Sequence, residues 1–256
     1  MTVKQRSAPS AKGIDVVYAL GSGTQWGDNE ELRYSLRALQ ANFSDLRQVY
    51  VVGQRPAWLG PAAIHIAADD VHRRNKDANI IEKLLLAARH PAIGPHFVRS
   101  SDDELLVRPT RFDQMRGRYH GGLHRRRLGD NLWNHRLERT QRYLFTRGYP
   151  THFYDCHLPV PYETRTFRRI AGRAPYATGA GLAIDSLYFN MAREAPVEQL
   201  DEKVVYLTKP LESVGDLARR VQGGTYLGYS NQALNEVLQD WLREAFPTPS
   251  RYEQVG

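Results

Sequence analysis

The chain has 256 residues, of which 41% are hydrophobic and 25% charged, and its 35 basic and 28 acidic residues give a formal net charge of +7. This length suffices for one α/β domain with a full core. A single cysteine, Cys156, excludes an internal disulfide and a cysteine-based zinc cluster, and no apolar run reaches the roughly 20 residues needed to span a bilayer. We therefore expect a cytoplasmic protein, with residues 1–12 as a polar, disordered tail.

The first third of the chain predicts a βαβ arrangement. Residues 13–20 form an apolar, β-branched run that stops at a glycine loop, 21–24, and residues 28–39 follow with helical spacing. Residues 48–52 and 63–67 read as a second and a third strand. The glycine loop lacks the third glycine of a dinucleotide fingerprint and the Gly-Lys-Ser/Thr of a phosphate loop, which excludes both. The fold class is α/β, with a largely parallel sheet and a ligand at the carboxyl ends of its strands.

Three consecutive carboxylates, Asp102, Asp103 and Glu104, follow the short apolar run that begins at Phe97. A strand that ends in these acids would set their side chains on alternating faces, so that one could reach Mg²⁺ or Mn²⁺ while its neighbour orients water or a sugar hydroxyl. Such a cation could bridge the phosphates of a nucleotide-sugar and stabilise the leaving nucleotide. The alternative is an acidic turn between strand and loop, because Asp is common there.

A polar block precedes the helix that is expected after residue 79. Asn75, Lys76 and Asn79 could face the nucleotide or sugar at the helix N-terminus, with Lys76 paired to a phosphate. The alternative is a capped helix start, with Asp77 or Asn79 as the cap and no ligand at all.

The first block offers further candidates for the donor. Asp28, Asn29 and Arg33 could contact base and ribose, and Gly21 opens the glycine loop beside them. Arg33 is equally plausible as a surface partner of Glu30 at helical spacing.

Arginine supplies 29 of the 35 basic residues, and nine arginines lie between residues 116 and 147 against two acids. Arginine forks bind phosphates and stack on bases, and aromatic faces support unpaired bases. This stretch predicts a nucleic-acid-facing surface. Its candidate residues are Arg116, Arg118, Arg125, Arg126, Arg127 and Trp133. The alternatives are a solvated basic face, or arginines that serve an anionic sugar nucleotide.

Residues 148–161 form a proline-bounded extended stretch that contains His157. His157 could complete a metal shell or transfer a proton, since an unperturbed histidine has a pKa of about 6.5, although a structural histidine is the alternative. A nucleophilic Cys156–His157 pair is disfavoured, because adjacent residues of an extended segment point to opposite faces.

The last third of the chain predicts further helices around one strand. A basic amphipathic helix is expected over 162–173, and a glycine-led helix over 179–190 would position Asp185. A strand is expected over 204–207. Residues 231–246 show apolar residues at helical spacing, with Ser230 as the candidate cap.

These blocks resemble, in order, those of Stealth-type sugar-phosphate transferases and, more broadly, the nucleotide-sugar-binding half of GT-A glycosyltransferases. The blocks are residues 15–18, 28–37, 49–52, 56–59, 102–103 and a His-Pro block at 157–167. The resemblance covers roughly residues 13 to 170 and implies a GT-A-like fold, a nucleotide-sugar donor such as a UDP-sugar, and Mn²⁺ or Mg²⁺. Residues 19–21 depart from the Trp-Val-Asp that usually continues the first block, so either a sugar or a sugar phosphate could be transferred.

The leading hypothesis is a metal-dependent glycosyltransferase formed by a single domain, 13–256. Residues 13–115 would bind the nucleotide-sugar, and 116–256 would be an Arg-rich, mainly helical extension that binds the acceptor. Asp103, His157 and Asp185 are the catalytic candidates, and the metal ligands would be Asp102, Asp103, Glu104 and His157. The expected acceptor is a hydroxymethylated pyrimidine in DNA, of the kind modified by bacteriophage enzymes. The alternatives are Stealth-type sugar-1-phosphate transfer to a saccharide, and a non-catalytic nucleic-acid-binding protein.

Overall fold

The computed structural model describes residues 13–21, 25–123 and 130–254 of the chain. Its main sheet has five strands in the order β3-β2-β1-β4-β7. Their bounds are β1 Ile14–Leu20, β2 Leu46–Gly53, β3 Ile64–Ile66, β4 His96–Ser100 and β7 Val160–Glu163. The first four strands run parallel, and β7 pairs with β4 in the antiparallel direction. The expected α/β class with a mostly parallel sheet is confirmed.

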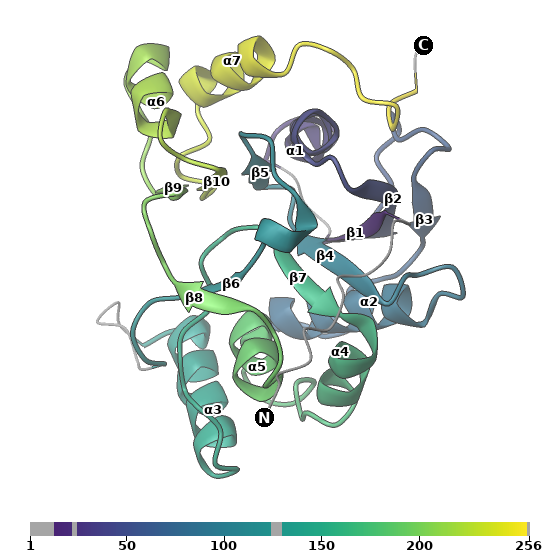
Figure 1. Cartoon of the computed structure of the whole chain (residues 1–256), viewed down its shortest axis with the longest axis vertical. Helices are drawn as coiled ribbons and strands as arrows, with labels where there is room; N and C mark the ends of the chain where they lie inside the picture. Colours follow the sequence, from purple (N-terminus) through teal and green to yellow (C-terminus); the bar gives the residue numbers. More distant parts are fainter. Residues whose placement is uncertain (1–12, 22–24, 124–129, 255–256) are drawn as a thin grey trace, which may run out of the picture.

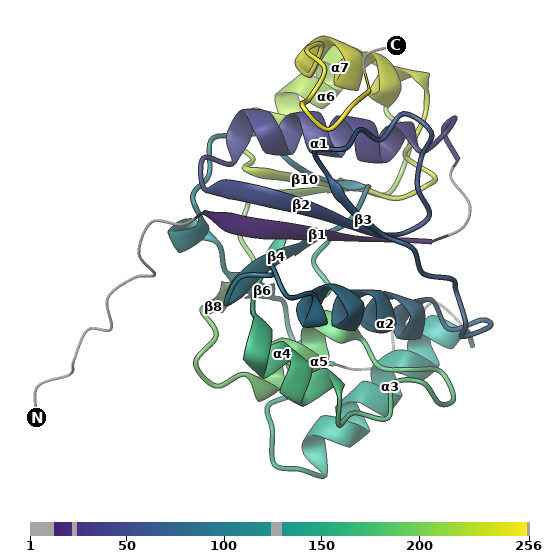
Figure 2. The same cartoon turned by 90° about the vertical axis from the view of Figure 1, so that its right-hand side faces the viewer.

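Helices cover both faces of this sheet (Figure 2). Helix α1, Glu30–Asn42, lies on one face, where α6, Val214–Val221, and α7, Glu236–Ala245, pack beyond it. On the other face lie α2, Lys76–Arg89, α3, Leu132–Phe145, α4, Thr164–Ala171, and α5, Ile184–Met191. Val16, Val17, Val51 and Val98 are completely buried between the layers. Strands buried on both faces are continuous apolar runs, which explains why the sequence predicted them well.

Two small sheets complete the fold. One has the order β5-β10-β9 and is formed by β5, Glu104–Leu106, β9, Val204–Leu207, and β10, Tyr226–Tyr229. The other pairs β6, Gly117–Tyr119, with β8, Val197–Gln199, and a short 3₁₀ helix, Phe112–Gln114, precedes it. Both sheets join segments that are distant in sequence, and the β5-β10-β9 sheet lies under α6 and α7 in Figure 1.

Several predicted boundaries are corrected by local hydrogen bonding. The strand expected to end in the three acids stops at Ser100, because the Glu104 amide donates to the Ser101 carbonyl at 3.2 Å and closes a turn. The helix expected to begin at residue 162 begins at Thr164, after β7, and the helix expected from 179 begins at Ile184. Ser230 is not the cap of α7: that helix starts later, where the side chain of Asn235 accepts from the Leu238 amide at 3.1 Å.

Within the described residues, none of the helices combines the length and the apolar character that crossing a bilayer requires.

Candidate active site

The candidate site lies at the carboxyl edge of the parallel strands, where β1 ends at Leu20, β4 ends at Ser100 and α2 begins at Lys76. Ligands of open α/β sheets bind at this edge, because loops and helix N-termini converge there.

Asp102 and Asp103 occupy the tight turn between β4 and β5, and both are half-buried. The turn is fixed from α1, since the Ser35 hydroxyl donates to the Glu104 carbonyl at 2.7 Å and also bonds Tyr18 at 3.0 Å. Burial raises the pKa of Asp102, the neighbouring Asp103 carboxylate raises it further, and Lys76 acts against both. The acidic turn therefore keeps two carboxylates close together and short of water.

Glu31 of α1 is a third carboxylate in this cluster, and it is 5% exposed. Its pKa is raised to about 7, first by burial and then by Asp102 and Asp103. The sequence did not indicate this role, because a glutamate in the first turn of a helix is usually exposed. The buried hydroxyl of Tyr229, on β10, lies within electrostatic range of the same three carboxylates. It has no hydrogen-bond partner among the described residues.

Asp155, His157 and Tyr206 form a second group of side chains near the acidic turn. The His157 ring stacks on Tyr206 with centroids 3.9 Å apart and planes at 6°, and its Nε2 lies 3.9 Å from Oδ1 of Asp155. Burial raises the pKa of Asp155, His157 opposes this, and Asp185 and Asp103 reinforce it. Tyr206 has its pKa raised to about 12 by burial and by Asp103 and Asp155. Asp155 and Tyr206 therefore lie within electrostatic range of Asp103 in the acidic turn.

The backbone of His157 is held in a strained conformation by the residues around it. Its φ of 50° lies in the left-handed region, which is rare for a residue other than glycine. Gly228 of β10 allows the close approach, since a Cβ there would lie 2.6 Å from the His157 carbonyl oxygen. Cys156 is buried and donates to the Arg118 carbonyl at 3.1 Å, while the half-exposed His157 ring packs on Tyr206. The sequence-based argument against a Cys–His pair agrees with this geometry.

Arg99, at the end of β4, ties two predicted site residues into the scaffold. Its guanidinium donates to both Glu104 oxygens, at 2.8 and 2.9 Å, and is also paired with Asp185, which receives the Tyr162 hydroxyl as well. Glu104 additionally accepts from the Ser101 amide. Because their oxygens are occupied by protein donors, Glu104 is not free to bind a metal, and Asp185 is not free to accept a substrate proton. We correct both assignments to structural roles.

Several predicted donor contacts are likewise engaged by the protein. Asn29 caps α1 by accepting from the Leu32 amide, and Asn75 caps α2 by accepting from the Ala78 amide. Asn79 exchanges two hydrogen bonds with the His72 backbone. For α2, the sequence analysis offered a capped helix start as the alternative, with Asp77 or Asn79 as the cap, whereas the structure shows Asn75 as the cap. These three asparagines are buried, and their hydrogen bonds fix the starts of α1 and α2.

The remaining donor candidates differ in availability. Asp28 accepts from the Ala57 amide at 2.6 Å. Arg33 pairs with Glu30 at 3.0 Å, as its spacing suggested, and stacks over Trp58. Gly21 is exposed at the end of β1, and Lys76 is exposed beside the acidic turn. Gly21, Asp28 and Lys76 are therefore the exposed candidates, although one carboxylate oxygen of Asp28 is already engaged by the protein.

Among the described residues, the predicted nucleic-acid contacts Arg116, Arg118 and Trp133 do not form one exposed face. Arg118 is 2% exposed and pairs with Glu198, at 2.5 Å, and with Asp201. Arg116 donates to two nearby carbonyls, and Trp133 is half-buried against Phe153 and Arg136. Arg118 therefore cannot contact a DNA backbone as predicted, because it is buried and neutralised. Arg125, Arg126 and Arg127 lie outside the described residues.

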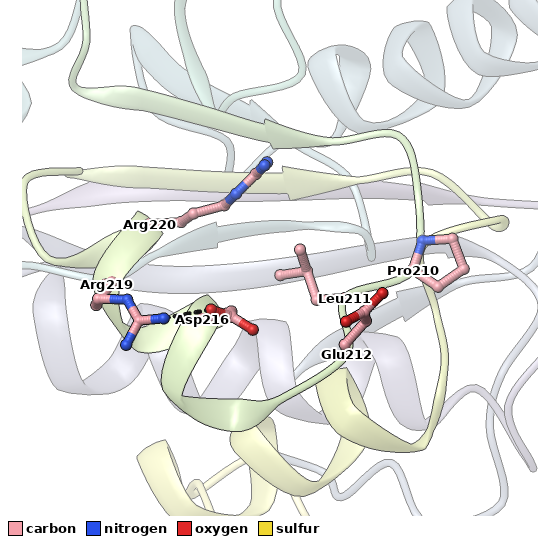
Figure 3. Close-up of a pocket in the computed structure, with 6 residues that line it drawn as sticks. All are labelled: Pro210, Leu211, Glu212, Asp216, Arg219 and Arg220. Carbon is pink, nitrogen blue, oxygen red and sulfur yellow. Dashed lines mark hydrogen bonds and ion pairs between the residues drawn. The ribbon is translucent and has the colours of Figure 1, made fainter.

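A separate hollow lies against α6 and the segment before it (Figure 3). It has a volume of about 460 Å³ and is lined by Pro210, Leu211, Glu212, Asp216, Arg219 and Arg220. Asp216 already accepts from Ser213 and pairs with Arg219. Two acidic and two basic residues line this hollow, so its charges balance. It is therefore a weaker candidate than the carboxyl edge of the main sheet with Glu31, Asp102 and Asp103, which we call the acidic edge.

Across the part of the chain that the structure describes, no three His, Cys, Asp or Glu residues are arranged to hold a metal ion by themselves. Mg²⁺, however, is commonly held by one or two carboxylates together with substrate phosphates and water. Asp102 and Asp103 fit that pattern, with Glu31 near them.

Comparison with known proteins gives one informative similarity. No family model matches the chain. A segment of 91 residues, 32% of this chain, is 36% identical to an exopolysaccharide phosphotransferase of Streptomyces coelicolor. The matched segment spans only 15% of that protein. The chain thus shares a segment of its sequence with an exopolysaccharide phosphotransferase, which supports in part the resemblance found in its ordered blocks.

Proposed function

We propose that this protein is a sugar-1-phosphate transferase that moves a sugar phosphate from a nucleotide-sugar, such as a UDP-sugar, to a saccharide hydroxyl. The observation that carries the proposal is the convergence of Glu31, Asp102, Asp103 and Asp155 with Lys76 at the carboxyl edge of the sheet. The partial similarity to an exopolysaccharide phosphotransferase supports phosphate transfer over simple glycosyl transfer. In the proposal the main sheet is the GT-A-like, nucleotide-binding half.

The chemistry of the donor set fits a hard divalent cation. Clustered carboxylates with raised pKa values and the unpartnered Tyr229 hydroxyl mark a place where a cation would relieve repulsion. Asp102 and Asp103 would hold Mg²⁺ or Mn²⁺, which would supply positive charge to the diphosphate as the nucleotide leaves. Lys76 at the start of α2 adds a second cationic contact for a phosphate oxygen.

In the reaction, the acceptor hydroxyl oxygen attacks the phosphorus that carries the sugar. The bond from that phosphorus to the bridging oxygen breaks, and a nucleoside monophosphate departs. Asp155 accepts the proton of the acceptor hydroxyl, and His157 lies beside it to orient the carboxylate. A carboxylate with a raised pKa suits this role, because it holds a proton more readily than an exposed aspartate does.

The product distinguishes the two transfers. We expect incubation of the protein with a UDP-sugar, a saccharide and Mn²⁺ to release a nucleoside monophosphate, detected by mass spectrometry. Release of a nucleoside diphosphate would replace the proposal with glycosyl transfer. Asp103→Ala should abolish Mn²⁺-dependent donor binding in calorimetry, whereas Cys156→Ser, which alters a residue outside the site, should leave it intact. Binding of the donor that is unchanged in Asp103→Ala would contradict the proposed site.

A further inference from the structure

A second charged cavity lies away from the acidic edge. It has a volume of about 700 Å³ and is lined by Arg89, Arg165, Arg168, Arg169, Gly172 and Arg173. Helix α4 packs beside α2, and this contact brings the four arginines after residue 164 next to Arg89. All five arginine side chains are exposed, so the protein has not buried them for its own stability.

The arrangement follows from the sequence of α4. Phe167, Ile170 and Ala171 are buried against the core. Arg165, Arg168 and Arg169 occupy the opposite face at i, i+3 and i+4, and Arg173 continues it beyond the helix end. The helix thus presents one apolar and one wholly basic face.

Ordinary helix electrostatics do not explain this cluster. Cations in the last turn of a helix are favourable, which accounts for Arg89 on α2 and for Arg168 and Arg169 on α4. Arg165 lies in the first turn of α4, where a cation is unfavourable, and Arg173 lies outside the helix. Within the described residues, none of the five guanidinium groups is paired with a carboxylate. Five like charges around one hollow repel one another unless an anion joins them.

We propose that this five-arginine pocket binds the phosphodiester groups of an anionic glycan chain. Arginine forks match phosphate oxygens, and the cavity is large enough for more than one such group. None of its lining residues is aromatic, so it offers no surface on which a nucleobase could stack, which disfavours nucleic acid.

The inference that the ligand is a glycan chain rests on the proposed function, whereas the inference of an anion-binding site rests on the arginines alone. Transfer of sugar phosphates produces phosphodiester-linked saccharides, which are polyanions. Arg89 and Lys76 lie at opposite ends of the 14-residue helix α2, so the pocket and the acidic edge are separated by about 20 Å. A glycan chain that reaches both would be held far from its reacting end.

The test uses a fluorescent oligo(glycerol phosphate), a phosphodiester chain without bases, and measures its binding by anisotropy. We expect Arg165→Gln/Arg168→Gln/Arg173→Gln to weaken binding by about ten-fold or more and to flatten its dependence on salt. The matched control, Arg108→Gln/Arg193→Gln/Arg220→Gln, removes the same charge from exposed positions elsewhere and should change binding by no more than about two-fold. Equal loss in both variants would show non-specific attraction and overturn the proposal.

Three competing ligands test which class of anion the pocket prefers. Oligothymidylate of equal charge, tripolyphosphate and anionic lipid vesicles should each bind more weakly than the oligo(glycerol phosphate). Tighter, pocket-dependent binding of any one of them would overturn the glycan assignment in favour of that ligand class. Because the five arginines are exposed, the variants should fold, and thermal melting checks this.

Failure of the pocket and failure of the proposed function give different results. Arginine-dependent binding of the phosphodiester oligomer without any transfer activity would refute the proposed function and leave the anion site standing. Transfer that is equally efficient on short and long phosphorylated acceptors, in wild type and in the triple variant, would refute the pocket and leave the function standing.

Discussion

Glu31, Asp102 and Asp103 come from two separate elements, α1 and the turn after β4, and meet at one edge of the sheet. Burial and the neighbouring carboxylates raise the pKa of Glu31 and of Asp102 in the absence of a cation. For Glu31, the folded-state pKa of about 7 lies above the ordinary value of 4.5. The contribution of Glu31 to the free energy of unfolding is therefore fully present below about pH 4.5. It is lost as the pH rises through 7.

We expect Glu31→Gln to stabilise the metal-free protein at pH 8 by up to about 3 kcal/mol and to have little effect at pH 4.5. The reason is that glutamine removes the carboxylate that has to ionise in a buried, negative environment. Urea denaturation at the two pH values measures the change. The exposed Glu244→Gln is the control. A variant that is destabilised equally at both pH values would show that Glu31 does not carry the predicted charge cost.

Asp155 gives a prediction about rate. As a base with a raised pKa, it is inactive while protonated, so kcat should rise with pH until the carboxylate has ionised. We expect Asp155→Asn to lower kcat by about 10² to 10⁴ and to remove this rise, with donor affinity retained. Cys156→Ser, in the adjacent position but hydrogen-bonded away from the site, should keep the wild-type profile. An unchanged pH profile in Asp155→Asn would assign the base to another residue.

At the scale of elements, Arg99 links β4, β5 and α5 through Glu104 and Asp185. Arg99→Met would leave two buried carboxylates without their cation, which typically costs about 3 to 5 kcal/mol. We expect the free energy of unfolding to fall by that amount in urea denaturation. Arg108→Met, at an exposed position, should stay within about 0.5 kcal/mol of wild type. Lost activity with unchanged stability in Arg99→Met would instead favour a catalytic role for Asp185.

The elements differ in how far the sequence could predict them. The order from β1 to β4 was predictable because long apolar strands alternate with amphipathic helices, and these patterns are local. Strands β5 and β10 were not, since each has three or four residues and is defined by a partner more than 100 positions away. Helices α3 and α6 were also missed, because their charged faces dominate their composition.

The same limit applies to the site. The sequence predicted Asp102, Asp103, Lys76 and His157 as site residues because ligand-type residues stand at the ends of predicted elements, and their role stays a prediction. Glu31 and the structural role of Arg99 could not be found in this way, because both depend on contacts formed between elements. The asparagine residues were misjudged because a helix cap and a ligand contact use the same side chain.

At the scale of the whole molecule, the arginine-rich stretch 116–147, in a chain of net charge +7, led to the prediction of a DNA acceptor, which no observation here supports. In a competition between hydroxymethylated DNA and a saccharide, with Mn²⁺ and a UDP-sugar, we expect only the saccharide to gain mass. Arg118, one of the arginines assigned to DNA, is neutralised inside the fold, and the similar protein acts on exopolysaccharide by its name. Plain DNA is the control for non-specific effects. A nucleoside that gains a hexose or pentose mass would restore the DNA acceptor.

The contact between Gly228 and His157 means that the candidate site is complete only after β10 has docked. The acidic turn precedes β10 by more than 100 residues in the chain, so we expect water to surround its carboxylates until β10 has docked. We therefore expect the site to acquire its raised proton affinity only when Tyr206, Gly228 and Tyr229 close around it. The docking of β10 should then take up protons from solution.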